Sequence, residues 1–147
     1  MREIRFIILH CADTEVDDCI DVSDIDRWHK EQGWVGVGYH YVITTDGRVQ
    51  QGRPLEVVGA HCLYYNQDSI GICYIGGRRN GVLADTRTEA QRRAMEQLVL
   101  ELMERFPKAV VCGHRDFNPD KACPCFNVVA WAMSIGISPS RIYRYAQ

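Results

Sequence analysis

The sequence predicts an α/β fold in which residues 1–147 form a single domain, with a central mixed β-sheet flanked by helices. Three observations support this prediction. Short runs of β-branched and aromatic residues, typical of buried strands, alternate irregularly with helical patterns, and one of these patterns is a long amphipathic helix. The dipeptide Asp46-Gly47 marks one definite hairpin. No repeat, low-complexity stretch or linker interrupts the chain, so one domain is the economical interpretation.

The first strand and the first helix are expected near the N-terminus. The β-branched and aromatic run at 4–9 predicts a buried strand that stops at His10. Ser23 is the expected N-cap of the helix, because acidic residues follow it in the next turn. This helix should pass through Trp28 and end near Gly33.

A hairpin and a second buried strand are expected in the middle of the chain. Residues 39–45 and 48–51 flank Asp46-Gly47, a two-residue turn signal. The apolar run at 70–75 predicts another buried strand, closed by Gly76-Gly77.

The clearest helical pattern begins near Thr88 and is ended by Pro107. Its apolar residues recur at helical spacing, as in Leu98, Leu102 and Phe106. Three shorter elements follow it in the sequence. They are a strand at 109–112 leading to Gly113-His114, a helix at 128–133 and a short helix starting at Pro139.

The composition indicates a soluble globular protein. Hydrophobic residues make up 46% and charged residues 24% of the chain, and the formal net charge is -2, which gives no support for general nucleic-acid binding. No apolar run approaches the roughly 20 residues needed to span a membrane, and no secretory signal is visible. Seven cysteines, an odd number, favour folding in a reducing compartment. We therefore expect a protein that is cytoplasmic as synthesised.

Two histidines and a cysteine are candidate metal ligands. His10 and His114 each follow an apolar run, and Cys123 lies nine residues after His114. Neutral imidazole and thiolate bind zinc well, and three protein ligands leave a fourth position for water, as in catalytic zinc sites. The spacing differs from the paired motifs of zinc fingers, and a histidine after a strand is more often a capping or core residue. The residues alone therefore leave a metal site and a structural role both open.

The sequence resembles the zinc amidase family that includes the lysozymes of short-tailed coliphages and the peptidoglycan recognition proteins, and it is most similar to the phage branch. The matching segments occur in the family's order and extend over most of the chain. They are 6–12, 28–34, 37–41, 66–72, and 113–116 with 121–124. The resemblance implies an N-acetylmuramoyl-L-alanine amidase that hydrolyses the amide between N-acetylmuramic acid and L-alanine in peptidoglycan or muropeptides.

The resemblance also implies a set of site residues. One Zn²⁺ per chain would be held by His10, His114 and Cys123, while Tyr39 and Lys121 would be catalytic. Zinc activates water and polarises a carbonyl, the Lys121 ammonium suits the developing oxyanion, and Tyr39 suits water orientation or proton transfer.

Three further residues are candidate substrate contacts. His61 matches a family histidine near the groove, and Trp34 and Asn66 offer the aromatic face and the amide that suit sugar or peptide ligands. His40 should turn to the opposite face of its strand and be structural.

Several alternatives stay open at this level. A module that binds muropeptide without cutting it would favour a substituted ligand, yet all three ligand types are present. Phage members of this branch are also known to inhibit a viral RNA polymerase, but nothing in this sequence establishes the contacts for that role. A structural zinc domain would need a closed coordination shell. The sequence does not separate a prophage lysin from an enzyme of wall recycling. Cys125 departs from the small hydroxyl residue usual in phage relatives, and such a thiol could compete for the metal or oxidise.

Overall fold

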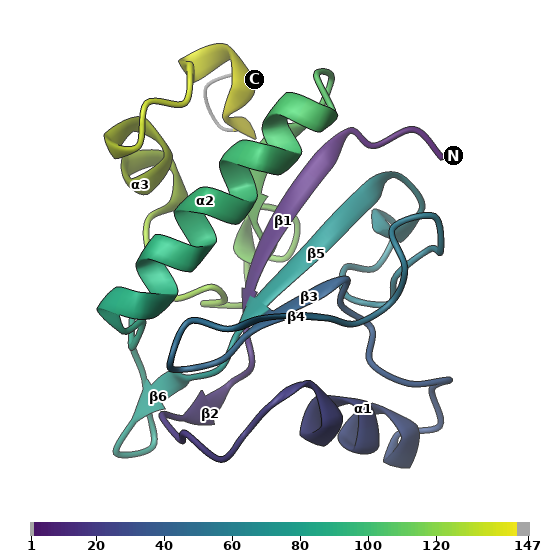
Figure 1. Cartoon of the computed structure of the whole chain (residues 1–147), viewed down its shortest axis with the longest axis vertical. Helices are drawn as coiled ribbons and strands as arrows, with labels where there is room; N and C mark the ends of the chain where they lie inside the picture. The colour runs from purple at the N-terminus through teal and green to yellow at the C-terminus, as the bar shows by residue number, and fades with distance from the viewer. Residues whose placement is uncertain (1, 144–147) are drawn as a thin grey trace.

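The centre of the molecule is a five-stranded mixed β-sheet with the strand order β4-β3-β5-β1-β8 (Figure 1). The structure is a computed structural model that describes residues 2–143. The strands are β1 (Phe6–Cys11), β3 (Tyr41–Ile43), β4 (Val49–Gln51), β5 (Ser69–Tyr74) and β8 (Val110–Gly113). Strands β3, β5, β1 and β8 are parallel, and only β4 runs antiparallel to its neighbour. The predicted mixed sheet is therefore confirmed.

Strand β1 extends further than the sequence predicted. It begins at Phe6 rather than at residue 4, and it continues through His10 to Cys11. The prediction that it stops at His10 was wrong because pairing with β5 does not end there: His10 lies opposite Cys73, and Cys11 lies opposite Tyr74. Pairing with Cys73 and Tyr74 keeps the backbone extended through His10 and Cys11. From composition alone, the polar His10 suggested the end of the strand.

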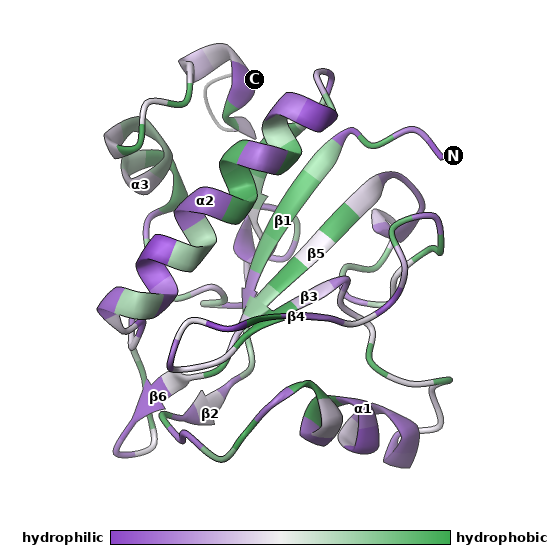
Figure 2. Ribbon diagram, viewed as in Figure 1, coloured by the Kyte–Doolittle hydropathy of each residue, from purple (hydrophilic) through white to green (hydrophobic). Residues whose placement is uncertain are grey.

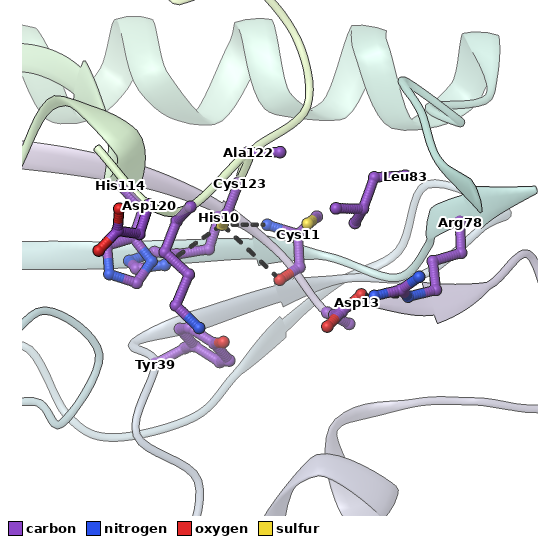
Figure 3. Close-up of a pocket in the computed structure, with 12 residues that line it drawn as sticks. His10, Cys11, Asp13, Tyr39, Arg78, Leu83, His114, Asp120, Ala122 and Cys123 are labelled. Carbon is purple, nitrogen blue, oxygen red and sulfur yellow. Dashed lines mark hydrogen bonds and ion pairs between the residues drawn. The ribbon is translucent and has the colours of Figure 1, made fainter. Parts of the chain in front are cut away.

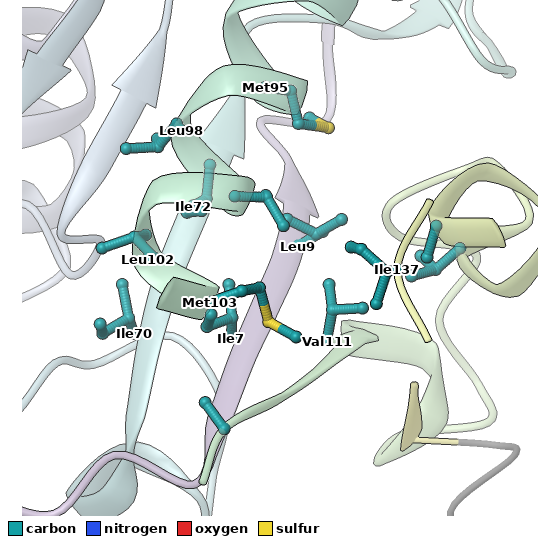
Figure 4. Close-up of a cluster of buried hydrophobic side chains, with 14 of the residues drawn as sticks. Ile7, Leu9, Ile70, Ile72, Met95, Leu98, Leu102, Met103, Val111 and Ile137 are labelled. Atoms are coloured by element: carbon teal, nitrogen blue, oxygen red, sulfur yellow. The ribbon is translucent and has the colours of Figure 1, made fainter. Parts of the chain in front are cut away.

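Helix α2 (Glu89–Arg105) covers one face of the sheet. It begins as predicted, because the Thr88 hydroxyl accepts from the Gln91 N–H and the Gln91 side chain accepts from the Thr88 N–H. Figure 4 shows its apolar side chains packed against β1, β5 and β8. The buried residues in this contact are Ile7, Leu9, Ile70, Ile72, Met95, Leu98, Leu102, Met103 and Val111. Burial of each such side chain contributes roughly 1.5–3 kcal/mol, so this contact forms the main core.

Two shorter helical elements follow β8. Helix α3 (Val128–Ser134) lies where the sequence predicted a helix at 128–133, and it contributes the buried residues Val128 and Ala132 to the main core. The Asn127 side chain caps it by accepting from the Ala130 N–H. The short 3-10 helix η3 (Pro139–Arg141) begins at the predicted proline. Figure 2 shows that β1 and β5 are largely hydrophobic, whereas hydrophobic and hydrophilic residues alternate along α2.

Helix α1 (Val22–Glu31) lies beside β3, away from α2 (Figure 1). Its N-cap is Asp21, not Ser23 as predicted: the Asp21 carboxylate accepts from the Ser23 N–H at 2.9 Å, and Asp24 completes the capping box. Both residues suit a cap and both have an acidic residue three positions later, but Asp26 accepts from the Val37 N–H and pairs with Lys30, so the capping box forms at Asp21. The buried Ile25 side chain packs the helix against Val42 and neighbouring apolar residues.

A small second sheet was not predicted. It has the order β2-β6-β7 and consists of β2 (Thr14–Glu15), β6 (Gly77–Arg79) and β7 (Val82–Leu83). Strands of two or three residues carry too little periodic pattern to be recognised from the sequence. The predicted hairpin, by contrast, is confirmed: Ile43 pairs with Val49 around the Asp46-Gly47 turn. Within residues 2–143 no helix combines the length and apolar character needed to cross a bilayer.

Alternation along β1 separates the core from a second, functional face. Ile7, Leu9 and Cys11 point into the core under α2 and α3. Ile8 belongs to a different apolar cluster, and His10, two residues further on, shares its face because successive strand side chains alternate. The sheet thus places a buried histidine opposite its main core.

A buried ion pair fixes the segment that precedes α2. The Arg87 side chain is 3% exposed, and its guanidinium carbon lies 3.4 Å from the centroid of the Phe126 ring. Asp85 accepts from Arg87 Nε at 3.0 Å and from its Nη2 at 3.1 Å. Burial tends to raise the pKa of Asp85, but hydrogen bonds and charge from Arg87, with the charge of Arg92, outweigh it, so the pKa lies below its ordinary value of 3.8.

We expect Asp85→Asn to lower the free energy of unfolding near pH 7 by about 2 kcal/mol, because it leaves a buried guanidinium without its charge partner. The lowered pKa means that the wild-type advantage is complete above the unfolded pKa and disappears as the pH falls through the folded pKa. Denaturant titrations between pH 7 and pH 2.5 would measure this. The exposed pair of Glu89 with Arg93 provides the control, since Glu89→Gln removes only a solvent-screened ion pair and should change the free energy of unfolding much less. Equal losses in the two variants would contradict the prediction.

Candidate metal centre

Three candidate ligands converge where β1 and β8 end (Figure 3). A nitrogen of His10, a nitrogen of His114 and the sulfur of Cys123 all lie within 4.8 Å of one another. The Cys123 Sγ atom is 3.8 Å from His10 Nδ1. The structure thus brings together the three residues that the sequence analysis named as ligands.

The sheet register sets the two histidines side by side. Leu9 of β1 lies opposite Gly113 of β8, so the next residue of each segment is a histidine. The two imidazole centroids are 4.6 Å apart. His114 opens the short 3-10 helix η2 (His114–Asp116), which is held to the strand because the Gly113 N–H donates to the Asp116 carboxylate at 2.8 Å.

Cys123 comes from an irregular segment that folds back to the strand ends. The Arg115 N–H donates to the Cys123 carbonyl at 2.9 Å, which closes the intervening loop. The Cys11 N–H points at the Cys123 sulfur, with an N–S distance of 3.2 Å. This contact helps to fix the position of the sulfur beside the two imidazoles, and cysteine sulfur is one of the ligands that zinc prefers.

The electrostatics suit neutral imidazole ligands. His10 is 1% exposed, and burial lowers its pKa well below the ordinary value, with further contributions from His61 and His114. Burial also lowers the pKa of His114, aided by the positive charge of Lys121. Two neutral imidazoles and one thiolate make a donor set that fits a borderline-soft divalent ion such as zinc.

The second nitrogen of His10 is held by a chain of buried groups. His10 Nε2 lies 2.8 Å from His61 Nδ1, and His61 Nε2 lies 3.2 Å from the Ser69 hydroxyl oxygen. When His10 Nδ1 binds a metal, the proton of His10 sits on Nε2 and donates to His61. His61 in turn carries its proton on Nε2 and donates to Ser69. Such outer partners fix the tautomer and orientation of a ligating histidine.

The absence of a side chain at Gly71 in β5 leaves room for the His61 ring in this chain of hydrogen bonds. A Cβ atom there would lie 2.6 Å from His61 Cγ, closer than real contacts allow. Ser69, Gly71 and Cys73 alternate with the core residues of β5 and share the face of His10. The sequence analysis did not single out Ser69 or Gly71. The period-two pattern around an isolated glycine in a buried strand was the available signal.

Two connected hollows flank the three ligands. One, of about 330 Å³, is lined by the three ligands together with Tyr39, Lys121 and other residues. The second, of about 480 Å³, is lined by Trp34, His61 and Asn66. Tyr39 and His114 line both hollows, so the two hollows are adjacent, and we refer to them together as the groove.

The remaining candidate residues lie along this groove. Tyr39 is partly buried, with its ring centroid 5.1 Å from that of His10, and burial raises its pKa well above the ordinary value. Lys121 is exposed. Trp34 is 41% exposed and lies against the His29 ring. The Asn66 side-chain oxygen accepts from the N–H groups of His61 and Cys62 at 2.8 and 2.9 Å, so it organises the loop that positions His61.

His40, expected to be structural, is fully buried away from the groove. Its Nδ1 accepts from the Gly71 N–H at 3.1 Å, and its Nε2 lies 2.8 Å from the Val57 carbonyl. Burial lowers its pKa to about 4, so it stays neutral. It thereby braces the strand segment that carries Gly71.

The fold and the site define a class: an α/β protein with a two-histidine, one-cysteine candidate metal centre in an open groove. Residues 1–126 match the N-acetylmuramoyl-L-alanine amidase family, and the chain belongs to that family. It is 40% identical over 126 residues to the endolysin of Escherichia phage T7, a match that covers 85% of this chain and 83% of the relative. The predicted family and enzyme class, an amidase hydrolase, are confirmed.

Solved structures show the same fold. The N-acetylmuramoyl-L-alanine amidase LysC from Clostridium intestinale superposes with a TM-score of 0.79 at 27% identity, covering 93% of this chain and 88% of that one. Drosophila PGRP-LB superposes with a TM-score of 0.77 at 26% identity, covering 93% and 84%. The predicted amidase and peptidoglycan recognition protein-like fold is confirmed.

We expect His61→Leu to weaken the affinity for a divalent metal by about 10- to 100-fold, because His10 loses the acceptor that sets its tautomer. His61→Asn should retain most of the affinity, since the amide oxygen takes the place of His61 Nδ1. Zinc competition against a chromogenic chelator would measure both, with melting temperatures of the metal-free proteins to separate folding from binding. Equal losses of affinity in both variants would show that the hydrogen bond does not position His10.

Proposed function

We propose that this amidase uses one zinc ion, held by His10, His114 and Cys123, to hydrolyse the amide between N-acetylmuramic acid and L-alanine. The observation that carries the proposal is the convergence of these three donors on the floor of an open groove. Three protein ligands leave a position for water, which distinguishes a catalytic from a structural zinc site. We further propose that residues 1–147 act as one catalytic domain, whose ends, residue 1 and residues 144–147, lie outside the described residues.

A zinc ion held there supplies Lewis acidity, which activates water as a nucleophile at neutral pH and polarises the amide carbonyl. The protein must do the rest. His61 and Ser69 keep His10 in the tautomer that presents Nδ1. The Cys11 N–H contacts the Cys123 sulfur and helps to hold it in place.

We assign to Lys121 the role of stabilising the negative charge that develops on the carbonyl oxygen. It lies two residues before Cys123 and lines the same hollow as the three ligands. Because its side chain is exposed and lines this hollow, its ammonium is accessible to a substrate bound there. A positive charge placed at the oxyanion stabilises the transition state more than the ground state.

We assign to Tyr39 the role of a proton or hydrogen-bond donor in the reaction. Its raised pKa keeps the phenol protonated at neutral pH, so its O–H is a donor and not a base. A donor at that position orients the attacking water or gives a proton to the leaving nitrogen. The position of Tyr39 on both hollows suits a group that contacts the scissile bond.

The groove is assigned to the peptidoglycan strand. The half lined by Trp34, His61 and Asn66 offers an aromatic face and polar edges, which suit a sugar or peptide. The other half contains Asp13 and Arg78, which suit a charged peptide stem. Since the relative from phage T7 is an endolysin, we propose the same role here, with bacterial cell wall as the target.

We expect release of soluble peptide stems from purified peptidoglycan to stop on zinc removal and to return when zinc is restored. Each released stem should carry a new L-alanine amino terminus. Cys123→Ser should abolish release because it removes a soft ligand, while Cys112→Ser, a buried thiol outside the ligand set, should retain it. End-group analysis would measure this. Tight muropeptide binding without release, in a folded and zinc-loaded protein, would identify a recognition module instead.

Tyr39→Phe and Lys121→Met should each lower kcat by about 100-fold or more. Zinc content and KM should change little, because neither residue is a ligand and both act on the transition state. Steady-state kinetics on a soluble muropeptide would measure this. Lys108→Met, an exposed lysine outside the groove, is the matched control. A rise in KM with unchanged kcat would assign the residue to substrate binding alone.

A further inference from the structure

A pair of cysteines that are not metal ligands lies beside the candidate metal centre. The Cys11 and Cys125 sulfurs are 3.8 Å apart. Cys11 is 5% exposed and lines the groove, and Cys125 is partly buried. Both are free thiols, and neither belongs to the ligand set. Two thiols at this separation are close to contact, and a disulfide needs about 2.05 Å.

The pair arises because the turn that contains Cys123 and Cys125 contacts both faces of β1 at its end. His10 and Cys11 point to opposite faces of the strand, as neighbours in a strand do. Cys123 and Cys125, two residues apart in the turn, meet them in order: Cys123 faces His10 and Cys125 faces Cys11. A hydrogen bond from the Cys125 N–H to the Ala122 carbonyl at 2.7 Å closes the turn.

The small second sheet encloses the pair on its other side. The Cys125 sulfur lies 3.8 Å from the Gly77 carbonyl oxygen. A Cβ atom at Gly77 would lie 2.7 Å from the Cys11 sulfur, so only glycine leaves room for the thiol. The two sulfurs therefore face each other in a confined space, and Cys123 is a further cysteine close to Cys11.

We propose that Cys11 and Cys125 form an oxidisable dithiol, a modification site for low-molecular-weight disulfides such as oxidised glutathione. In the first step the Cys125 sulfur loses its proton, attacks one sulfur of the oxidant and releases one glutathione thiol. In the second step the Cys11 sulfur loses its proton, attacks Cys125 in the mixed disulfide and releases the second glutathione. The sum is two protein thiols and one oxidised glutathione giving one protein disulfide and two glutathione thiols.

Exchange starts at Cys125 because its side chain is the more exposed of the two. Cys11 then completes the exchange, since its sulfur is the one beside the Cys125 sulfur. Cys123 is spared when it holds zinc, because coordination withdraws electron density from the sulfur and makes it a weaker nucleophile than a free thiolate; this selectivity rests on the proposed function. The closed disulfide would tie the central strand β1 to the segment that supplies Cys123 and Lys121. It crosslinks residues far apart in the sequence, which restricts the unfolded chain most.

The test is oxidation of the full zinc-loaded chain in a glutathione redox buffer, followed by alkylation and mass spectrometry. Trypsin releases Cys11 in the peptide 6–27 and Cys125 in the peptide 122–141. Each peptide contains a second cysteine, Cys19 or Cys123, so the experiment uses a Cys19→Ser background, and fragmentation separates Cys123 from Cys125. We expect the two peptides linked through Cys11 and Cys125, unchanged zinc content, and a higher melting temperature that returns to the original value on reduction.

Single variants provide the controls. Cys11→Ser and Cys125→Ser should each prevent the crosslink, with glutathione retained on Cys125 in the first, whereas Cys112→Ser should leave it intact. A zinc-loaded protein whose two thiols stay reduced or only glutathionylated would overturn the proposal, as would a crosslink through Cys123 with loss of zinc. A chain that binds no zinc would count against the proposed function instead, and zinc content is measured before oxidation to tell these failures apart.

Discussion

The parallel pairing of β1 with β5 on one side and β8 on the other is the constraint on which the rest depends. Ile7, Ile8 and Leu9 are completely buried, so this strand is held by both neighbours and by apolar contacts on both faces. A slip of one residue would exchange the faces and put His10 into the main core. The hydrophobic pattern therefore fixes the register, and the register places His10 beside His114.

Placing a polar site against a buried sheet face has a cost that the structure offsets locally. An unpaired buried polar group costs free energy, and within residues 2–143 no buried side-chain nitrogen or oxygen lacks a partner. The chain from His10 through His61 to Ser69 satisfies the ring nitrogen that faces away from Cys123. The hydrogen bonds that make burial tolerable are the same ones that set the ligand's tautomer, so stability and function are coupled here.

The sequence predicted those parts that depend on local chemistry. The start of α2 follows from Thr88 and Gln91, and the hairpin follows from Asp46-Gly47, because a cap and a turn are properties of adjacent residues. The extension of β1 through Cys11 depends on pairing with a strand about 60 residues away. The same holds for the contact between His10 and His61. The ligand set came from the family resemblance, since spacing alone did not separate ligands from structural histidines.

The loop that supplies Cys123 shows how an irregular segment can place a ligand as firmly as a strand does. The buried Tyr74 hydroxyl donates to the Pro124 carbonyl at 2.7 Å, so strand β5 holds the residue next to Cys123. The Arg115 N–H and the Cys11 N–H hold Cys123 itself through its carbonyl and its sulfur. These donors come from three separate segments, and each is fixed by the sheet or its flanking turn. A donor set assembled in this way is preorganised by the core, because any shift of Cys123 would break several of these hydrogen bonds at once.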